Sequence, residues 1–99
     1  MANDLGIAYT RAGSPAQALT EFGRALALHP GSASALHNRG LALLLLGQRD
    51  AAVADFRRSL EKDPCLFDAR VNLIRLGEPL PSAGVCRWTA AQQRAISAR

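Results

Sequence analysis

Residues 6–30 read GIAYTRAGSPAQALTEFGRALALHP, and residues 40–64 read GLALLLLGQRDAAVADFRRSLEKDP. Among the positions of these two stretches that match at a spacing of 34 residues are six that matter for the fold: Gly6 and Gly40, Gly13 and Gly47, Ala18 and Ala52, Phe22 and Phe56, Leu26 and Leu60, and Pro30 and Pro64. No insertion is needed to align them. The sequence therefore contains an internal repeat, and the period of this repeat decides the expected fold.

Each period predicts two helices followed by a stop. The first helix is expected to end at Gly13, because glycine readily adopts the left-handed conformation that closes a helix. The second helix begins at Pro15, with Ser14 and Gln17 as a predicted capping box. It ends before Pro30, because proline lacks an N–H and disfavours helical geometry in the residue before it. The same stops recur one period later.

The second helix of each period has one apolar stripe. Ala18, Phe22 and Leu26 fall four residues apart, as do the matching residues of the next period, so they lie on one helix face. Glu21 and Arg24 are expected to pair on the opposite, solvated face. The apolar stripe is therefore the predicted packing face.

These features together resemble the tetratricopeptide repeat, over residues 2–64. The resemblance implies an all-α fold: a right-handed α-solenoid of antiparallel helix pairs, with about six helices. It also implies that small residues let helix backbones approach while phenylalanine rings fill the space between pairs. The residues expected to carry this packing are Gly6, Tyr9, Ala18, Phe22, Pro30, Gly40, Ala52, Phe56 and Pro64.

A chain of 99 residues predicts a single domain. Within it we expect repeat 1 at residues 2–31, repeat 2 at 32–65, a partial repeat 3 at 66–77, a loop at 78–87 and a C-terminal capping helix at 88–99. Ile74 replaces the small residue of the earlier periods, and the prolines and glycines after residue 76 break the chain. Thr89 is the predicted cap of the final helix, which would cover the open end of the stack.

The resemblance implies a function in binding, because the first helices of successive repeats in this family line a concave groove that takes an extended peptide or a helix. The groove residues expected here are Asn3, Asp4, Ile7, Arg11, His37, Asn38, Leu41, Asn72 and Arg75. Asp4, Asn38 and Asn72 occupy one repeated place, where family members often carry an asparagine that hydrogen-bonds the ligand backbone. The alternative is that these asparagines are simply exposed polar residues.

Some members of the family instead hold the C-terminal carboxylate of a chaperone tail with lysine, arginine and asparagine. Asn38 matches that clamp, but Asp68 and Asn72 stand where a clamp protein has its two cations. Binding of a chaperone tail is therefore disfavoured, although Arg11 or Arg75 could supply a cation.

The leucine run at residues 41–46 covers more than one face of its helix. Some of its leucines should face outward, as an apolar floor of the groove or as a patch for self-association. The alternative is that neighbouring helices and the lid bury them. A structural module that self-associates, or that is part of a longer array, is the second functional hypothesis.

Other classes of function find little support in the sequence. The net charge of +4 is scattered, and no aromatic platform or dense basic stripe indicates nucleic-acid binding. His29 and His37 lack a serine or cysteine at catalytic spacing, and no metal or cofactor motif appears, so we expect no enzyme activity.

Cys65 and Cys86 form no metal-binding motif and are expected to be buried thiols or bystanders. No apolar run is long enough to cross a bilayer, and no secretory leader is seen, which predicts a cytoplasmic protein.

Overall fold

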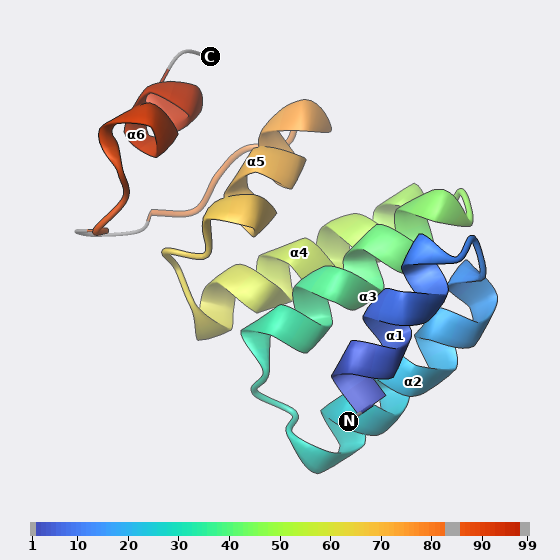
Figure 1. Ribbon diagram of the computed structural model, residues 1–99. Helices are drawn as coiled ribbons and strands as arrows, with labels where there is room; N and C mark the ends of the chain where they lie inside the picture. The colour runs from blue at the N-terminus through green and yellow to red at the C-terminus, as the bar shows by residue number, and fades with distance from the viewer. Residues whose placement is uncertain (1, 83–85, 98–99) are drawn as a thin grey trace.

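The structure is a computed structural model that describes residues 2–82 and 86–97. These residues form six α-helices and no strand: α1 (Ala2–Arg11), α2 (Pro15–Leu28), α3 (Ala33–Leu45), α4 (Arg49–Lys62), α5 (Phe67–Arg75) and α6 (Ala90–Ser97). Helices α1 and α2 form one antiparallel pair, and α3 and α4 form the next (Figure 1). The prediction of an all-α stack of helix pairs is confirmed.

The first helix of every period ends in the same way. Gly13, Gly47 and Gly77 have φ angles of +81°, +77° and +72°, in the left-handed region that favours glycine. After the first of these glycines, the N–H of Ser14 donates to the carbonyl of Tyr9 at 2.8 Å, and equivalent bonds follow the other two. Glycine therefore fixes the turn between the helices of a pair, as predicted.

The predicted start of the second helix is only partly right. Pro15 is the first residue of α2, but Ser14 makes no capping hydrogen bond with its side chain, so the proposed capping box is wrong. Ser14 has a ψ angle of 62°, outside the extended conformation of an ordinary N-cap. The extended Ser32 does cap α3, where its hydroxyl accepts from the N–H of Ala35 at 3.2 Å.

The core depends on the pairing of a glycine with a phenylalanine in each repeat. Phe22 and Phe56 are buried, and their rings lie directly against Gly6 and Gly40 of the preceding helix. A Cβ added at Gly6 would lie 2.4 Å from Cε1 of Phe22, and one at Gly40 would lie 2.7 Å from Cε1 of Phe56. The rings also pack against the following pair, through Ala42 for Phe22. The repeated small and aromatic residues thus have the packing role that was predicted.

Buried charges are a feature that the sequence did not predict. Glu21 pairs with Arg24 at 2.8 Å, but it is buried rather than on a solvated face. Asp55 is also buried, and its carboxylate accepts from Nε and Nη2 of Arg39 at 2.7 and 2.8 Å and from Arg58 at 3.2 Å. Both buried carboxylates therefore lie on second helices, and each is paired with arginine.

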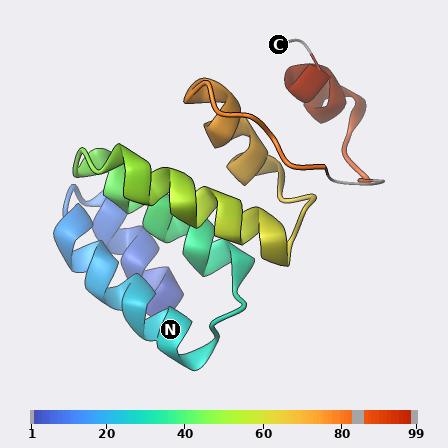
Figure 2. The ribbon, with the colours of Figure 1, turned by 180° about the vertical axis from the view of Figure 1, so that it is seen from behind.

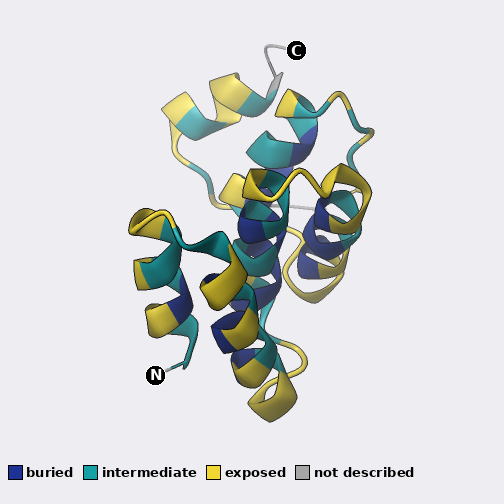
Figure 3. Cartoon of the chain, turned by 90° about the vertical axis from the view of Figure 1, so that its right-hand side faces the viewer, coloured by how far each residue is buried: buried dark blue, intermediate teal, exposed yellow. Residues whose placement is uncertain are grey.

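The C-terminal region departs from the repeat. Helix α5 packs against α4, and α6 lies beyond α5, farthest from α1 (Figures 1 and 2). Most of α6 is exposed (Figure 3). Thr89 caps it as predicted, through reciprocal bonds with Gln92 of 3.0 and 3.1 Å. The predicted range of this last helix, 88–99, ends in residues 98–99, which lie outside the described residues.

The interpretation of the two cysteines is wrong, because Cys65 and Cys86 form a disulfide. The chain after α5 returns to the turn between α4 and α5, which brings together residues 21 positions apart. Disulfides are most common in oxidising compartments, so this bond gives no support to the predicted cytoplasmic location. Among the described residues, no helix has the length and apolar character needed to cross a membrane.

Candidate functional site

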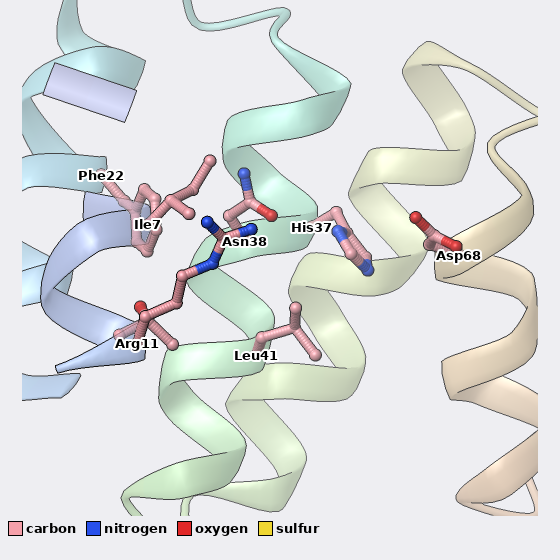
Figure 4. A pocket seen from close by; sticks show the side chains of 8 residues that line it. Ile7, Arg11, Phe22, His37, Asn38, Leu41 and Asp68 are labelled. Carbon is pink, nitrogen blue, oxygen red and sulfur yellow. The ribbon is translucent and has the colours of Figure 1, made fainter. Parts of the chain in front are cut away.

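The first helices α1, α3 and α5 border an open hollow with a volume of about 330 Å³ (Figure 4). The residues that line it are Ile7, Thr10, Arg11, Phe22, His37, Asn38, Leu41 and Asp68. Five of the nine predicted groove residues are in this set. We call this hollow the groove.

The apolar part of the groove comes from neighbouring turns of two helices. Ile7 on α1 and Leu41 on α3 are half-buried, and each packs against a buried cluster of the core. The ring of Phe22 lines the groove between them and the core. Because residues four apart share a helix face, Ile7 is aligned with Arg11, and Leu41 with His37. The fold therefore places apolar and polar side chains together.

Two exposed charges of opposite sign stand on opposite walls. Arg11 lies in the last turn of α1, and Asp68 lies in the first turn of α5. Figure 4 shows the Arg11 side chain extending across the groove toward Asn38. Within the described part of the chain, neither charge forms an ion pair. Both remain free to meet a charge on a ligand.

The asparagines bridge successive first helices. Nδ2 of Asn38 donates to Oδ1 of Asn3 at 3.2 Å, and the amide of Asn72 lies 2.9 Å from Nε2 of His37. Asn3 and His37 are 34 residues apart, and so are Asn38 and Asn72. The second bond therefore joins the positions that are equivalent to those of the first. This cross-link between repeats was in neither of the two interpretations offered by the sequence.

His37 joins the groove to the core. It is buried, and the centroid of its ring lies 5.6 Å from that of Phe56. Burial lowers the pKa of His37 below its usual 6.5, and the charge of Asp68 and a hydrogen bond with Asn38 offset this only in part. The imidazole is therefore neutral at pH 7, and it can accept a hydrogen bond from the Asn72 amide.

A family model for the tetratricopeptide repeat matches residues 3–64, which is more than half of the chain. The chain belongs to the tetratricopeptide repeat family. Such repeats generally serve as protein–protein interaction modules. No curated protein matches the chain.

The remaining predicted residues of this tetratricopeptide domain do not line the groove. Asn3 and Asn72 are not lining residues, but they form hydrogen bonds with Asn38 and His37, which are. Asp4 and Arg75 are exposed outside it. Asp4 is therefore separate from Asn38 and Asn72, although the three are equivalent in the repeat.

The sequence missed three of the lining residues. Phe22 was assigned to the core, and its ring also reaches the groove. Thr10 precedes Arg11, and its hydroxyl donates to the carbonyl of Gly6 at 2.8 Å. Asp68 was considered only as a residue that breaks a carboxylate clamp. The signal that could have identified Asp68 as a lining residue was its place in the first turn of α5, which borders the end of the groove.

The leucines of the tetratricopeptide domain divide between several surfaces. Leu41 lines the groove, and Leu43 lines a second hollow of about 470 Å³ between α2, α3 and α4. Leu45 is 62% exposed, so the prediction that part of the run faces outward is confirmed. The second hollow holds the charges of Arg39, Asp55 and Arg58, which pair with one another. Of these two hollows, the groove is the one lined by charges that form no ion pair with the described residues, and it is therefore the better candidate site.

Across residues 2–82 and 86–97, no group of three or more histidine, cysteine or acidic side chains is placed to hold a metal ion.

Proposed function

We propose that this tetratricopeptide domain is a non-catalytic adaptor that binds an extended peptide segment of a protein partner in the groove. The observation that carries the proposal is the guanidinium of Arg11, which forms no ion pair with any described residue, beside the half-buried side chains of Ile7 and Leu41. Binding sites commonly combine apolar contact area with a few polar groups that fix the orientation of the ligand.

Each part of the groove suits a different part of a peptide. Ile7 and Leu41 would take an apolar side chain out of water. The carbonyl oxygen of Asn38 can accept from a peptide N–H, because the bond to Asn3 uses the amide nitrogen and the oxygen has a second lone pair besides the one that faces His37. Arg11 would attract a carboxylate, and Asp68 would attract a cation farther along the groove. A peptide with separated charges of opposite sign and an apolar residue between them fits this order.

The same order of charges disfavours nucleic acid as the ligand. Asp68 would repel phosphate at one end of the groove, and Arg39 and Arg58 are already paired with Asp55. Unchanged fluorescence polarisation of labelled RNA and DNA at low salt is the expected result.

Self-association is a second candidate, supported by exposed leucines away from the groove. Leu28 is 75% exposed and Leu45 is 62% exposed, and apolar surface of this kind often marks a contact. Light scattering at increasing concentration checks this candidate, and a mass that stays monomeric would remove it.

The peptide proposal can be tested by selecting, from a displayed library of random 12-residue peptides, those that bind the full chain. Peptides that enrich are then titrated against Arg11→Glu and against Arg94→Glu, a matched change of charge on the exposed face of α6. We expect Arg11→Glu to weaken binding by on the order of tenfold, since it replaces a charge attraction by a repulsion, and Arg94→Glu to leave it unchanged. Equal affinities for the two variants, with the helical circular dichroism intact, would contradict the proposed site.

A further inference from the structure

The disulfide joins two segments that the repeat does not bring together. Cys65 lies in the turn between α4 and α5, and Cys86 lies four residues before α6. Both residues are half-buried, and their Cα atoms are 5.5 Å apart. The bond thus fastens the segment that leads into α6 to the start of α5.

A second set of contacts fastens the same two segments. Nε1 of Trp88 donates to the carbonyl of Cys65 at 2.8 Å, and the Trp88 ring meets Phe67 edge to face with centroids 6.2 Å apart. The guanidinium of Arg70 lies over the indole ring of Trp88, with its Cζ 5.8 Å from the centroid of the ring. The disulfide and the indole therefore share one docking place on the turn.

Arg70 is a buried cation at this place, and no acidic side chain of the described residues pairs with it. Its side chain is only 5% exposed, although its hydrogen bonds go to the carbonyls of Pro64 and Pro81 and not to a carboxylate. Its Nε makes no hydrogen bond within the described part of the chain. A buried cation without an acidic partner is costly, so removal of the covering segment would return this guanidinium to water. The free energy gained by hydrating the guanidinium offsets part of the free energy lost when the contacts of Trp88 are broken.

Little else holds α6 in place. Ala90, Ala91, Arg94 and Ala95 are exposed, and within the described part of the chain the helix that α6 contacts most is α5. A helix of 8 residues is marginal in water unless other parts of the fold support it. The disulfide is therefore the strongest tie between the last part of the chain and the stack.

We propose that the Cys65–Cys86 bond is a redox-controlled latch, whose reduction by a dithiol releases Trp88 and α6 while α1–α4 stay folded. In this exchange a thiolate of the dithiol bonds to one sulfur of the disulfide, and the other sulfur leaves as a thiolate and takes up a proton. The second thiol of the reductant then displaces the first cysteine, so the protein gains two electrons and two protons and the dithiol becomes a disulfide.

The released state also loosens one wall of the groove. Phe67 and Asp68 are neighbours in the first turn of α5, so the latch holds the helix that carries the acidic end of the groove. This consequence rests on the proposed function, whereas the latch itself does not.

Trp88 is the single tryptophan of the chain and reports on the latch directly. The full chain is purified under air, its free thiols are counted in denaturant, and the emission wavelength and acrylamide quenching of Trp88 are measured before and after dithiothreitol. We expect no free thiol before reduction and two after it, together with a red shift of the emission and stronger quenching. The helical circular dichroism should stay within about a fifth of its starting value, because α1–α4 hold most of the helical residues.

The variant Cys65→Ser/Cys86→Ser is the matched control. It should show the emission of the reduced protein without any reductant and should not respond to dithiothreitol. Two free thiols in the air-oxidised protein, or an emission that reduction leaves unchanged, would overturn the latch. Collapse of the helical signal on reduction would also overturn it, because the bond would then support the whole fold. Peptide titrations under both conditions test the groove separately, since binding that persists after α6 is released leaves the proposed function intact.

Discussion

The two repeats at α1–α4 and the C-terminal region at α5 and α6 begin alike and then differ. All three first helices end at a glycine with positive φ. In the repeats, Gly6 and Gly40 leave room for a buried ring of the next helix. In the third period Ile74 occupies that place, and no phenylalanine follows at the repeat spacing. Helix α6 is displaced beyond α5 and stays largely exposed (Figure 3).

Helix α5 still packs into the core of the repeats, because Ala69 and Leu73 are buried in one cluster with Phe56. The segment after α5 is held by a different kind of contact. Besides the disulfide, Glu78 after α5 accepts from Arg57 at 2.8 Å and from Arg49 at 3.2 Å, both on α4. Arg57 first, and then Arg49, lower the pKa of Glu78 below its usual value. The difference shows that close packing of a ring against a glycine builds the stack, and that polar and covalent ties attach what lacks such packing.

The largest expected effect is the loss of a ring from the repeats. Phe56→Ala should lower the free energy of unfolding by about 3–5 kcal/mol, because it leaves a cavity at a fully buried position. Urea denaturation followed by circular dichroism measures this change. Trp88→Ala, in the C-terminal region, should leave the main unfolding transition nearly unchanged. If the two variants were equally destabilised, Trp88 would contribute to the core as much as Phe56 does, and the comparison would fail.

The next effect concerns the buried carboxylate of the repeats. Asp55→Ala removes three charge-assisted hydrogen bonds and should cost roughly 2–3 kcal/mol, moderated because Arg39 can regain water. Thermal and urea unfolding report the change, and Glu61→Ala on the exposed face of α4 serves as the control, with an effect within about 0.5 kcal/mol. A neutral result for Asp55→Ala would mean that the ion pair adds nothing to the stack.

A smaller change in the free energy of unfolding is expected for two helical glycines, Gly40 and Gly23, with opposite signs. Gly40→Ala should destabilise by about 1–3 kcal/mol, because its Cβ would meet the Phe56 ring. Gly23 also lies inside a helix but has nothing within 4 Å of an added Cβ. Gly23→Ala should therefore stabilise by roughly 0.5–1 kcal/mol through helix propensity. Paired urea titrations decide the matter, and the same sign for both variants would refute the role given to Gly40.

The smallest effect is the dependence of stability on pH. Because burial lowers the pKa of His37 in the folded state, the unfolded chain binds this proton more readily. The contribution of His37 to stability is thus full above pH 6.5 and is lost as the pH falls from 6.5 toward the lowered value. Urea unfolding on both sides of pH 6.5, compared with His37→Gln, should show a steeper loss in the wild type. Parallel pH profiles would contradict this assignment.

The sequence predicted the stack but not the pairing of its polar side chains. Matches at one period report which residues are equivalent, and Phe22, Phe56 and the turn glycines follow from that. The bond of Asn38 to Asn3 joins residues 35 apart, so a search for equal positions does not find it. Which of two adjacent side chains meets the neighbouring helix depends on the rotation of α1 against α3, and that rotation is set by packing.

The C-terminal region was predicted least well, for a related reason. The helix after Thr89 could be predicted from its cap, and the helix after Phe67 from its alignment with the first helices of the two repeats. The return of Cys86 to Cys65 could not, because a non-repeating loop places no constraint on which distant residue it meets.

A map of amide chemical shifts on addition of a library-selected peptide tests the central claim most directly. If the groove is the binding surface, the largest shifts will fall on residues around Ile7, Arg11 and Leu41, on the faces of α1 and α3 that line it. Largest shifts around Leu19, Leu43 and Arg58, in the second hollow, would contradict the account.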